Sequence, residues 1–221
     1  MAENAVKLAV VTGGHSYDVP NFHLLFRTLE GVESYIQHMD DFASSPKDVR
    51  QSYDAVLFYI MLMDGPTDEK MPWYSGKPKT ALEELGQTSQ GILVLHHAIL
   101  AYPQWQNWND IVGIDDRRFM YYMGQRLHVD AADASHPIAA ALKNWEMPDE
   151  TYAMADAEPV NGNQILLTAN HPRSMKTLAW TRQHGQSRVF CLQSGHDNLT
   201  WADPNFRQVL QRGVLWCAGR I

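Results

Sequence analysis

The stretch GILVLHHA, residues 91–98, decides the fold class because an apolar run leads directly into two histidines. An unbroken apolar run is typical of a strand covered on both faces, since such a strand has no solvent-facing side to make polar. Neighbouring side chains on a strand point to opposite faces, so His96 and His97 can share one site only if the strand ends before them. We therefore predict a buried strand over 92–95, followed by a turn that carries two imidazoles.

The first half of the chain alternates short apolar runs with helical patterns. The predicted strands are residues 7–11, 34–38, 55–63 and 92–95. The predicted helices are residues 20–29, 44–52 and 78–89. Helix 20–29 is the clearest, because its apolar residues recur at helical spacing behind Pro20. Strands that alternate with helices predict right-handed crossovers and a mostly parallel α/β sheet with helices on both faces.

The second half of the chain has a different pattern, because strand-like segments follow one another with few helices between them. These pieces cover residues 118–130, 150–157, 164–169, 176–183 and 187–194. Gly185 marks a hairpin turn between the last two, and a final helix is expected over 205–218. We predict extra mixed or antiparallel strands at a sheet edge, within a single domain spanning residues 1–221.

Charge and cysteine content exclude several classes of protein. A net charge of -7 without a basic run argues against nucleic-acid binding. Cys191 and Cys217 are the only cysteines, so no disulfide framework is indicated and a reducing compartment fits. The N-terminal segment has Glu3 where a signal peptide needs positive charge, and its apolar run is too short for a membrane span. We expect a cytoplasmic protein that does not contact a membrane.

Reactive side chains follow three of the predicted strands. In an open α/β sheet, ligands bind beyond the carboxyl ends of the strands. The candidates after the first, fourth and last strands are His15 and Asp18, His96 and His97, and His196 and Asp197. Structural alternatives exist for each pair: Asp18 is also a helix-start signal, a buried histidine can hydrogen-bond a carbonyl, and Gly-His-Asp-Asn is also a turn sequence.

Further residues are candidates for substrate contacts. Trp105 and Trp201 offer aromatic faces of the kind that cover sugar rings, although a place in the core would explain a tryptophan equally well. Tyr17 lies close behind the first strand, and Glu150 in the segment PDETY supplies a carboxyl group from the second half. The aromatic loop 102–108 is also a candidate contact in a homo-oligomer.

Three segments together carry a family resemblance: VVTGGHSYDVPNF (10–22), GILVLHHAI (91–99) and SRVFCLQSGHDNLTWADPNFRQVLQRGVLWCAGR (187–220). They resemble the ThuA-like, trehalose-utilisation family, whose three-layer fold is similar to the flavodoxin-like and class I glutamine amidotransferase folds. The resemblance implies bacterial sugar catabolism, acting on disaccharides or on keto derivatives made by partner dehydrogenases. One departure concerns the third strand, which many relatives end with an aspartate, whereas this chain has Ile60 and Met61 there and Asp64 further on.

The related amidotransferases place a cysteine nucleophile in the turn after the corresponding central strand. Here that turn reads Leu95-His96-His97-Ala98, without a thiol or flanking glycines, so glutamine hydrolysis is not expected. Cys191 lies inside a predicted strand and is interpreted as a small buried hydrophobe.

The leading hypothesis is a sugar-processing enzyme that uses imidazoles for general acid–base catalysis of isomerisation, elimination or hydrolysis. The expected catalytic residues are His15, His97, His196 and Asp197, and the expected substrate contacts are His96, Asp18, Tyr17, Trp105, Glu150 and Trp201. One alternative is a divalent metal such as Zn²⁺ held by His15, His97 and His196. Another is a non-catalytic carbohydrate-binding module. Of the adjacent histidines, the pleat favours His97 facing the ligand, with His96 supporting it.

Overall fold

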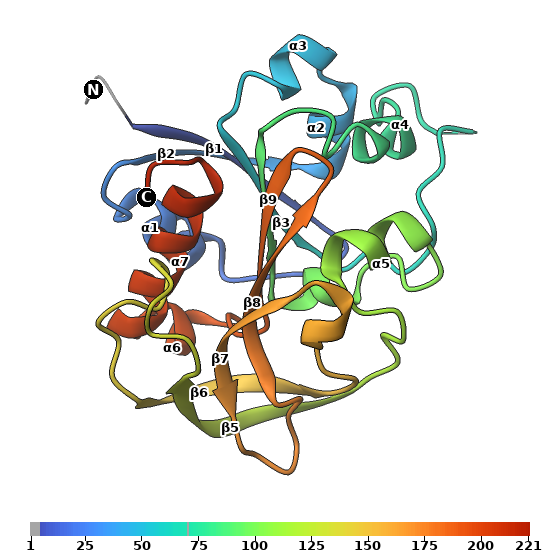
Figure 1. Cartoon of the computed structure of the whole chain (residues 1–221). Helices are drawn as coiled ribbons and strands as arrows, with labels where there is room; N and C mark the ends of the chain where they lie inside the picture. Colours follow the sequence, from blue (N-terminus) through green and yellow to red (C-terminus); the bar gives the residue numbers. More distant parts are fainter. Residues whose placement is uncertain (1–4, 70) are drawn as a thin grey trace.

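The computed structural model describes residues 5–69 and 71–221. These residues form one nine-stranded sheet in the order β2-β1-β3-β4-β9-β8-β7-β5-β6 (Figure 1). The strands are β1 (Val6–Gly13), β2 (Val32–His38), β3 (Ala55–Ile60), β4 (Gly91–Leu95), β5 (Met120–Ala131), β6 (Trp145–Ala153), β7 (Gln164–Ala169), β8 (Thr177–His184) and β9 (Ser187–Leu192).

The sheet has a parallel half and an antiparallel half that meet at β9. Strands β2, β1, β3, β4 and β9 pair in parallel. Strands β9, β8, β7, β5 and β6 pair antiparallel. The expectation of a mostly parallel sheet is therefore corrected to a mixed sheet with equal halves. The expected hairpin joins β8 to β9, where His184 pairs with Ser187 and Gly185 takes a left-handed φ of 55°.

Helices cover both faces of the parallel half. They are α1 (Val19–Arg27), α2 (Met39–Ser44), α3 (Lys47–Arg50), α4 (Pro78–Glu83), α5 (Gln106–Val112), α6 (Asn198–Trp201) and α7 (Pro204–Cys217), with 3₁₀ turns η1 (His96–Leu100) and η2 (Pro159–Asn161). Alternate residues of β1 belong to two buried clusters: Leu8 packs with residues of α1 and α7, and Ala9 packs with residues of α2, α4 and α5. This alternation follows from the two-residue repeat of a strand.

Several boundaries differ from those predicted from sequence. The helix expected over 44–52 is shortened to α3, and α2 ends before it at Ser44, because Pro46 lacks the amide that would continue α2. Strand β3 ends at Ile60 rather than at residue 63. The loop 102–108 leads into the unpredicted helix α5, and within it Trp108 is fully buried.

None of the helices in the described part of the chain is both long and apolar enough to span a membrane. The parallel pairing brings the carboxyl ends of β1, β3, β4 and β9 to the same edge of the sheet. This edge is where the candidate histidines gather.

Candidate functional site

The chain turns sharply after β4, and this turn sends the adjacent histidines in different directions. His96 has a left-handed φ of 53°, which is uncommon for a residue with a side chain. Strand pairing stops at Leu95, so the alternation of strand side chains no longer governs His96 and His97. The His96 ring contacts Tyr152 and the His97 ring contacts Tyr59, with centroid distances of 4.9 Å and 4.1 Å. Both imidazoles can therefore take part in one site.

His97 presents an unpartnered nitrogen. Its Nδ1 lies 2.9 Å from the carbonyl oxygen of Ile60, which only accepts hydrogen bonds, so Nδ1 carries the proton. The other ring nitrogen, Nε2, is buried and has no hydrogen-bond partner within the described residues. Burial, with a further contribution from His96, lowers the pKa of His97 to about 2. The ring is therefore neutral at working pH, with a free lone pair on Nε2.

His15 and His196 complete a group of four imidazoles with His96 and His97. The ring centroid of His15 lies 4.7 Å from that of His97 and 6.0 Å from that of His196. The His96 and His196 centroids are 5.3 Å apart. Gly14 makes this approach feasible, since its φ is 75° and a Cβ there would come too close to the carbonyl oxygen of Met61.

Three of these imidazoles line a cavity of about 490 Å³, which we call the histidine pocket. Its lining residues are His15, Ser16, Met61, His97, Phe119, Tyr121, Met123, Glu150, Tyr152 and His196. His15 is exposed, His196 is half-buried and His97 is buried. The pocket thus joins strand ends of the parallel half to β5 and β6 of the antiparallel half.

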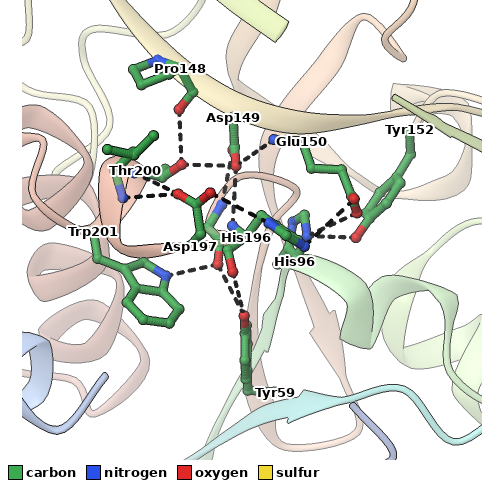
Figure 2. Close-up of polar contacts among 12 residues, drawn as sticks. Tyr59, His96, Pro148, Asp149, Glu150, Tyr152, His196, Asp197, Thr200 and Trp201 are labelled. Atoms are coloured by element: carbon green, nitrogen blue, oxygen red, sulfur yellow. Dashed lines mark hydrogen bonds and ion pairs between the residues drawn. The ribbon is translucent and has the colours of Figure 1, made fainter. Parts of the chain in front are cut away.

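Strand β6 adds a carboxylate and a phenol to the imidazoles (Figure 2). The Glu150 carboxylate oxygens lie 3.5 Å from Nε2 of His96 and 3.6 Å from Nε2 of His196. Burial would raise the pKa of Glu150, but its hydrogen bond to His96 and the charges of both imidazoles outweigh burial and hold the pKa below its usual value. The Tyr152 hydroxyl lies 2.7 Å from the same Nε2 of His96, and burial keeps the pKa of this phenol far above its usual range.

Asp149 positions the loop that carries His196. Its buried carboxylate accepts hydrogen bonds from the backbone amides of Gly195 and His196 and from the Thr200 hydroxyl, at 3.0, 3.1 and 2.9 Å. From the opposite side, the Tyr59 hydroxyl donates to the His196 carbonyl oxygen at 2.9 Å (Figure 2). Burial raises the pKa of Asp149 despite these hydrogen bonds. The sequence did not indicate Tyr59 as a site residue, and it indicated Asp149 and Tyr152 only as members of the segment PDETY that could supply an acid or base. Only the folded sheet brings these three residues to the strand ends.

Some predicted substrate contacts occupy structural positions instead. Asp18 caps helix α1 by accepting from the Asn21 amide at 3.2 Å. Trp201 is only 2% exposed and donates from Nε1 to the Gly195 carbonyl, so neither of its faces is open to a sugar. These two predictions are corrected: helix capping and core packing account for both residues.

Two other predicted contacts lie outside the histidine pocket. Trp105 is half-buried against Tyr102, at a ring distance of 5.8 Å, and does not line the pocket. Tyr17 packs on Phe22 and lines a neighbouring cavity beside β2. Both are therefore removed from the contacts assigned to this pocket.

Asp197 has a mixed role. One carboxylate oxygen caps helix α6 by accepting from the Leu199 amide at 2.9 Å, and the other lies 3.7 Å from Nδ1 of His196. The residue therefore starts a helix and orients an imidazole at the same time.

The geometry also changes the candidate metal ligands. Among the described residues, the donor atoms of His96, Glu150 and His196 all lie within 4.8 Å of one another. The donor atoms of the predicted set, His15, His97 and His196, do not all lie within this distance of one another. The metal-ligand prediction is corrected accordingly.

Comparisons with known proteins point to one family. The model of the ThuA family, described as trehalose utilisation, matches residues 30–217. A ThuA-like protein of Parabacteroides merdae is 19% identical, with a TM-score of 0.73 over 98% of this chain and 91% of that chain. No curated protein sequence matches the chain.

More distant structures share the fold. A cytoplasmic protein of Salmonella typhimurium is 11% identical, with a TM-score of 0.66 over 96% of this chain and 99% of that chain. A GMP synthase component from Thermoplasma acidophilum is 11% identical, with a TM-score of 0.56 over 97% and 95% of the two chains. At these identities the likeness concerns the fold alone.

Proposed function

Because the chain belongs to the ThuA, trehalose-utilisation family, we propose that it acts on a disaccharide or keto-sugar in the histidine pocket by general acid–base catalysis. The observation that carries this proposal is the pairing of two unlike imidazoles, the exposed His15 and the buried His97, at 4.7 Å on one pocket wall. Their different environments suit them to different tasks.

The position of the pocket supports a ligand site. The parallel strands run in the order β2-β1-β3-β4-β9, and this order supports a flavodoxin-like interpretation of the parallel half. In doubly wound sheets the order in which strands are added reverses between the first and third strands, and ligands bind outside the carboxyl ends there. His15 follows β1, and Met61 follows β3, so the pocket lies next to this reversal.

His15 is the residue proposed to move protons. A ketone acidifies the C–H bond on the neighbouring carbon, and a neutral imidazole that removes this proton leaves an enediolate. Returning the proton to a different carbon isomerises the sugar, whereas giving it to a glycosidic oxygen that leaves from the adjacent carbon completes an elimination. Exposure lets His15 exchange its proton with solvent, and such general acid–base catalysis typically contributes about 10²–10⁴-fold.

His97 is better suited to hold the substrate than to take a proton. With a pKa of about 2 it stays neutral, and Nε2 has no partner within the described residues. A sugar hydroxyl that donates to Nε2 would satisfy this nitrogen and orient the ring beside His15. This assignment refines the predicted catalytic role of His97 into a positioning role.

Covalent amidotransferase chemistry is not part of the proposal. The residue at the turn after β4 is His96, and the Cys191 thiol is buried inside β9 with its pKa raised far above its usual range by burial. A thiol in that state supplies no thiolate nucleophile. The keto-sugar itself requires a dehydrogenase that oxidises the sugar first, and a cytoplasmic setting fits two free buried cysteines.

The test is to incubate the protein with 3-keto-disaccharides and with the parent disaccharides in D₂O and to follow the products by NMR. We expect turnover of the keto-sugars, with deuterium entering at the carbon next to the ketone. His15→Ala and His97→Ala should each lose most of this turnover. The exposed His128, which pairs with Asp130 and does not line the pocket, provides the control His128→Ala.

Two outcomes would contradict the proposal. Turnover that survives His96→Ala, His97→Ala and His196→Ala would show that the reaction occurs elsewhere. Calorimetric binding of sugars without any turnover would favour the alternative of a non-catalytic carbohydrate-binding module.

A further inference from the structure

Three electron-pair donors converge at the inner wall of the histidine pocket, contributed by His96, Glu150 and His196 (Figure 2). Both imidazoles direct Nε2 at the same carboxylate, at 3.5 and 3.6 Å. The ion pairs of Glu150 within the described residues involve only these two histidines. The cluster therefore contains two nitrogen donors and one oxygen donor around a common point.

A hydrogen bond behind the His96 ring and a nearby carboxylate behind the His196 ring orient the two imidazoles. Nδ1 of His96 lies 2.7 Å from the carbonyl oxygen of Gln193, which only accepts hydrogen bonds, so Nδ1 donates there and Nε2 is the nitrogen that faces the carboxylate. Nδ1 of His196 faces the Asp197 carboxylate at 3.7 Å. A backbone carbonyl on one ring and a carboxylate on the other are the outer partners that metal-bound histidines commonly have.

Burial makes this arrangement costly unless positive charge lies among the donors. The His96 side chain is 0% exposed, and those of Glu150 and His196 are 11% and 16% exposed. In such a poorly solvated place, a carboxylate beside two imidazole nitrogens is stabilised by positive charge, and a metal cation is the species that all three groups can bind at once. The Tyr152 hydroxyl lies 2.7 Å from Nε2 of His96 and also hydrogen-bonds Glu150, but it carries no positive charge.

We propose that His96, Glu150 and His196 bind a divalent transition-metal ion of the zinc class. Two imidazoles and one carboxylate are a ligand set that catalytic metal sites use, with further positions left for water or substrate. Metal binding at Nε2 of His96 replaces its hydrogen bond with Tyr152. Glu150, Tyr152 and His196 all line the histidine pocket, so a ligand in the pocket has access to the ion.

The chemical role of the ion rests on the proposed function. A metal ion held there would polarise the carbonyl of a bound keto-sugar and so favour removal of the neighbouring proton by His15. No oxidation or reduction is involved, because the proton moves between carbon and imidazole while the electron pair stays on the sugar.

The experiment measures metal binding directly. Untagged protein is stripped with chelator, reconstituted separately with Zn²⁺, Co²⁺ and Mn²⁺, dialysed and assayed by elemental analysis, with the visible spectrum recorded for Co²⁺. We expect about one ion per chain for at least one metal, and loss of that ion in Glu150→Gln. Glu146→Gln is the matched control, because Glu146 lies on the same strand but pairs with Arg126 at the surface.

A milder variant tests the outer partner without disturbing the fold. Asp197→Asn keeps a good helix-capping residue while removing the charge behind His196. We expect it to weaken metal affinity by about 10–100-fold. Wild-type protein that holds no ion after reconstitution, or a Glu150→Gln variant that binds as tightly as wild type, would overturn the site.

The same samples separate this inference from the proposed function. A protein that binds the ion through Glu150 but leaves every keto-sugar unchanged supports the metal site and contradicts the proposed reaction. A metal-free protein that turns over keto-sugars at the full rate and cannot be loaded contradicts the metal site and leaves the proposed reaction standing.

Discussion

The parallel and antiparallel halves of the sheet contribute different chemistry to the histidine pocket. The parallel half provides imidazoles at its strand ends, including His15 and His97. The antiparallel half provides Asp149, Glu150 and Tyr152 from a strand four places beyond β9 in the sheet order. The imidazoles thus lie just after parallel strands, where ligand sites of α/β sheets are expected. The acidic groups come from β6, which reaches the site only through the tertiary structure.

The largest expected effect comes from breaking the connection between the halves at Asp149. Asp149→Ala leaves the amides of Gly195 and His196 and the Thr200 hydroxyl without their acceptor, so the free energy of unfolding should fall by about 3–5 kcal/mol. Urea denaturation measures this value. Glu146→Ala, at an exposed position of the same strand, should change stability much less, and equal losses in the two variants would contradict the role given to Asp149.

His15 tests the parallel half as the source of proton transfer. His15→Ala should lower kcat for a keto-sugar by about 10²–10⁴-fold while leaving stability nearly unchanged, since the side chain is exposed. Steady-state kinetics and thermal unfolding measure the two quantities. His23 lines the neighbouring cavity beside β2, so His23→Ala serves as the control. A similar fall in both variants would show that His15 has no special role.

His97 should make the protein sensitive to acid. Its folded-state pKa of about 2 lies below the ordinary 6.5, so the unfolded chain gains a proton as pH falls through 6.5 while the native ring does not. The contribution of His97 to the free energy of unfolding is therefore fully present above pH 6.5. It is lost as the pH falls toward 2, at about 1.4 kcal/mol per pH unit. Over the two pH units below the ordinary pKa, wild type should lose about 2–3 kcal/mol more than His97→Asn.

Urea titrations at several pH values measure this difference. Asparagine at position 97 retains a donor for the Ile60 carbonyl but has no basic nitrogen. The exposed His128 supplies the control, since His128→Asn should keep the wild-type slope. Parallel curves for wild type and His97→Asn would mean that the His97 ring is protonated in the native state.

Substitution of Asp18 should give the smallest effect. Asp18 also shows that a position just after a strand does not by itself make a residue a ligand contact. Because Asp18 caps helix α1, Asp18→Ala should lower the free energy of unfolding by about 0.5–2 kcal/mol, and Asp18→Asn should recover most of this loss. Neither variant should change kcat/KM for a keto-sugar. A selective loss of kcat/KM would return Asp18 to the substrate contacts.

The sequence predicts the parallel half of the site well because strand ends are local features. The run before His96 and the loops carrying His15 and His196 could be located from apolar patterns alone, and parallel pairing then brings them together. Asp18 and Trp201 show where this reasoning fails, because proximity in the chain to a strand end does not specify the direction of a side chain. Helix capping and core packing decided those two cases.

Glu150 and Tyr152 show a different limit. Both were visible as an acidic and aromatic segment, but nothing local indicates that β6 lies against the turn after β4. That contact depends on how far the mixed sheet curves, which is a property of all nine strands. The hydrogen bonds of Asp149 to residues 195–200 then fix the arrangement.

The link between Asp149 and residues 195–200 has a consequence for local opening of the site. It ties β6 to the loop after β9 through hydrogen bonds of 3.0 and 3.1 Å, and β4 pairs with β9 across a far longer stretch of chain than this link closes. Because β5 and β6 stand at the end of the sheet order, their local opening would remove Glu150 and Tyr152 from the pocket while most of the core stays folded. Hydrogen exchange in β6 would then report the fraction of molecules with a complete site.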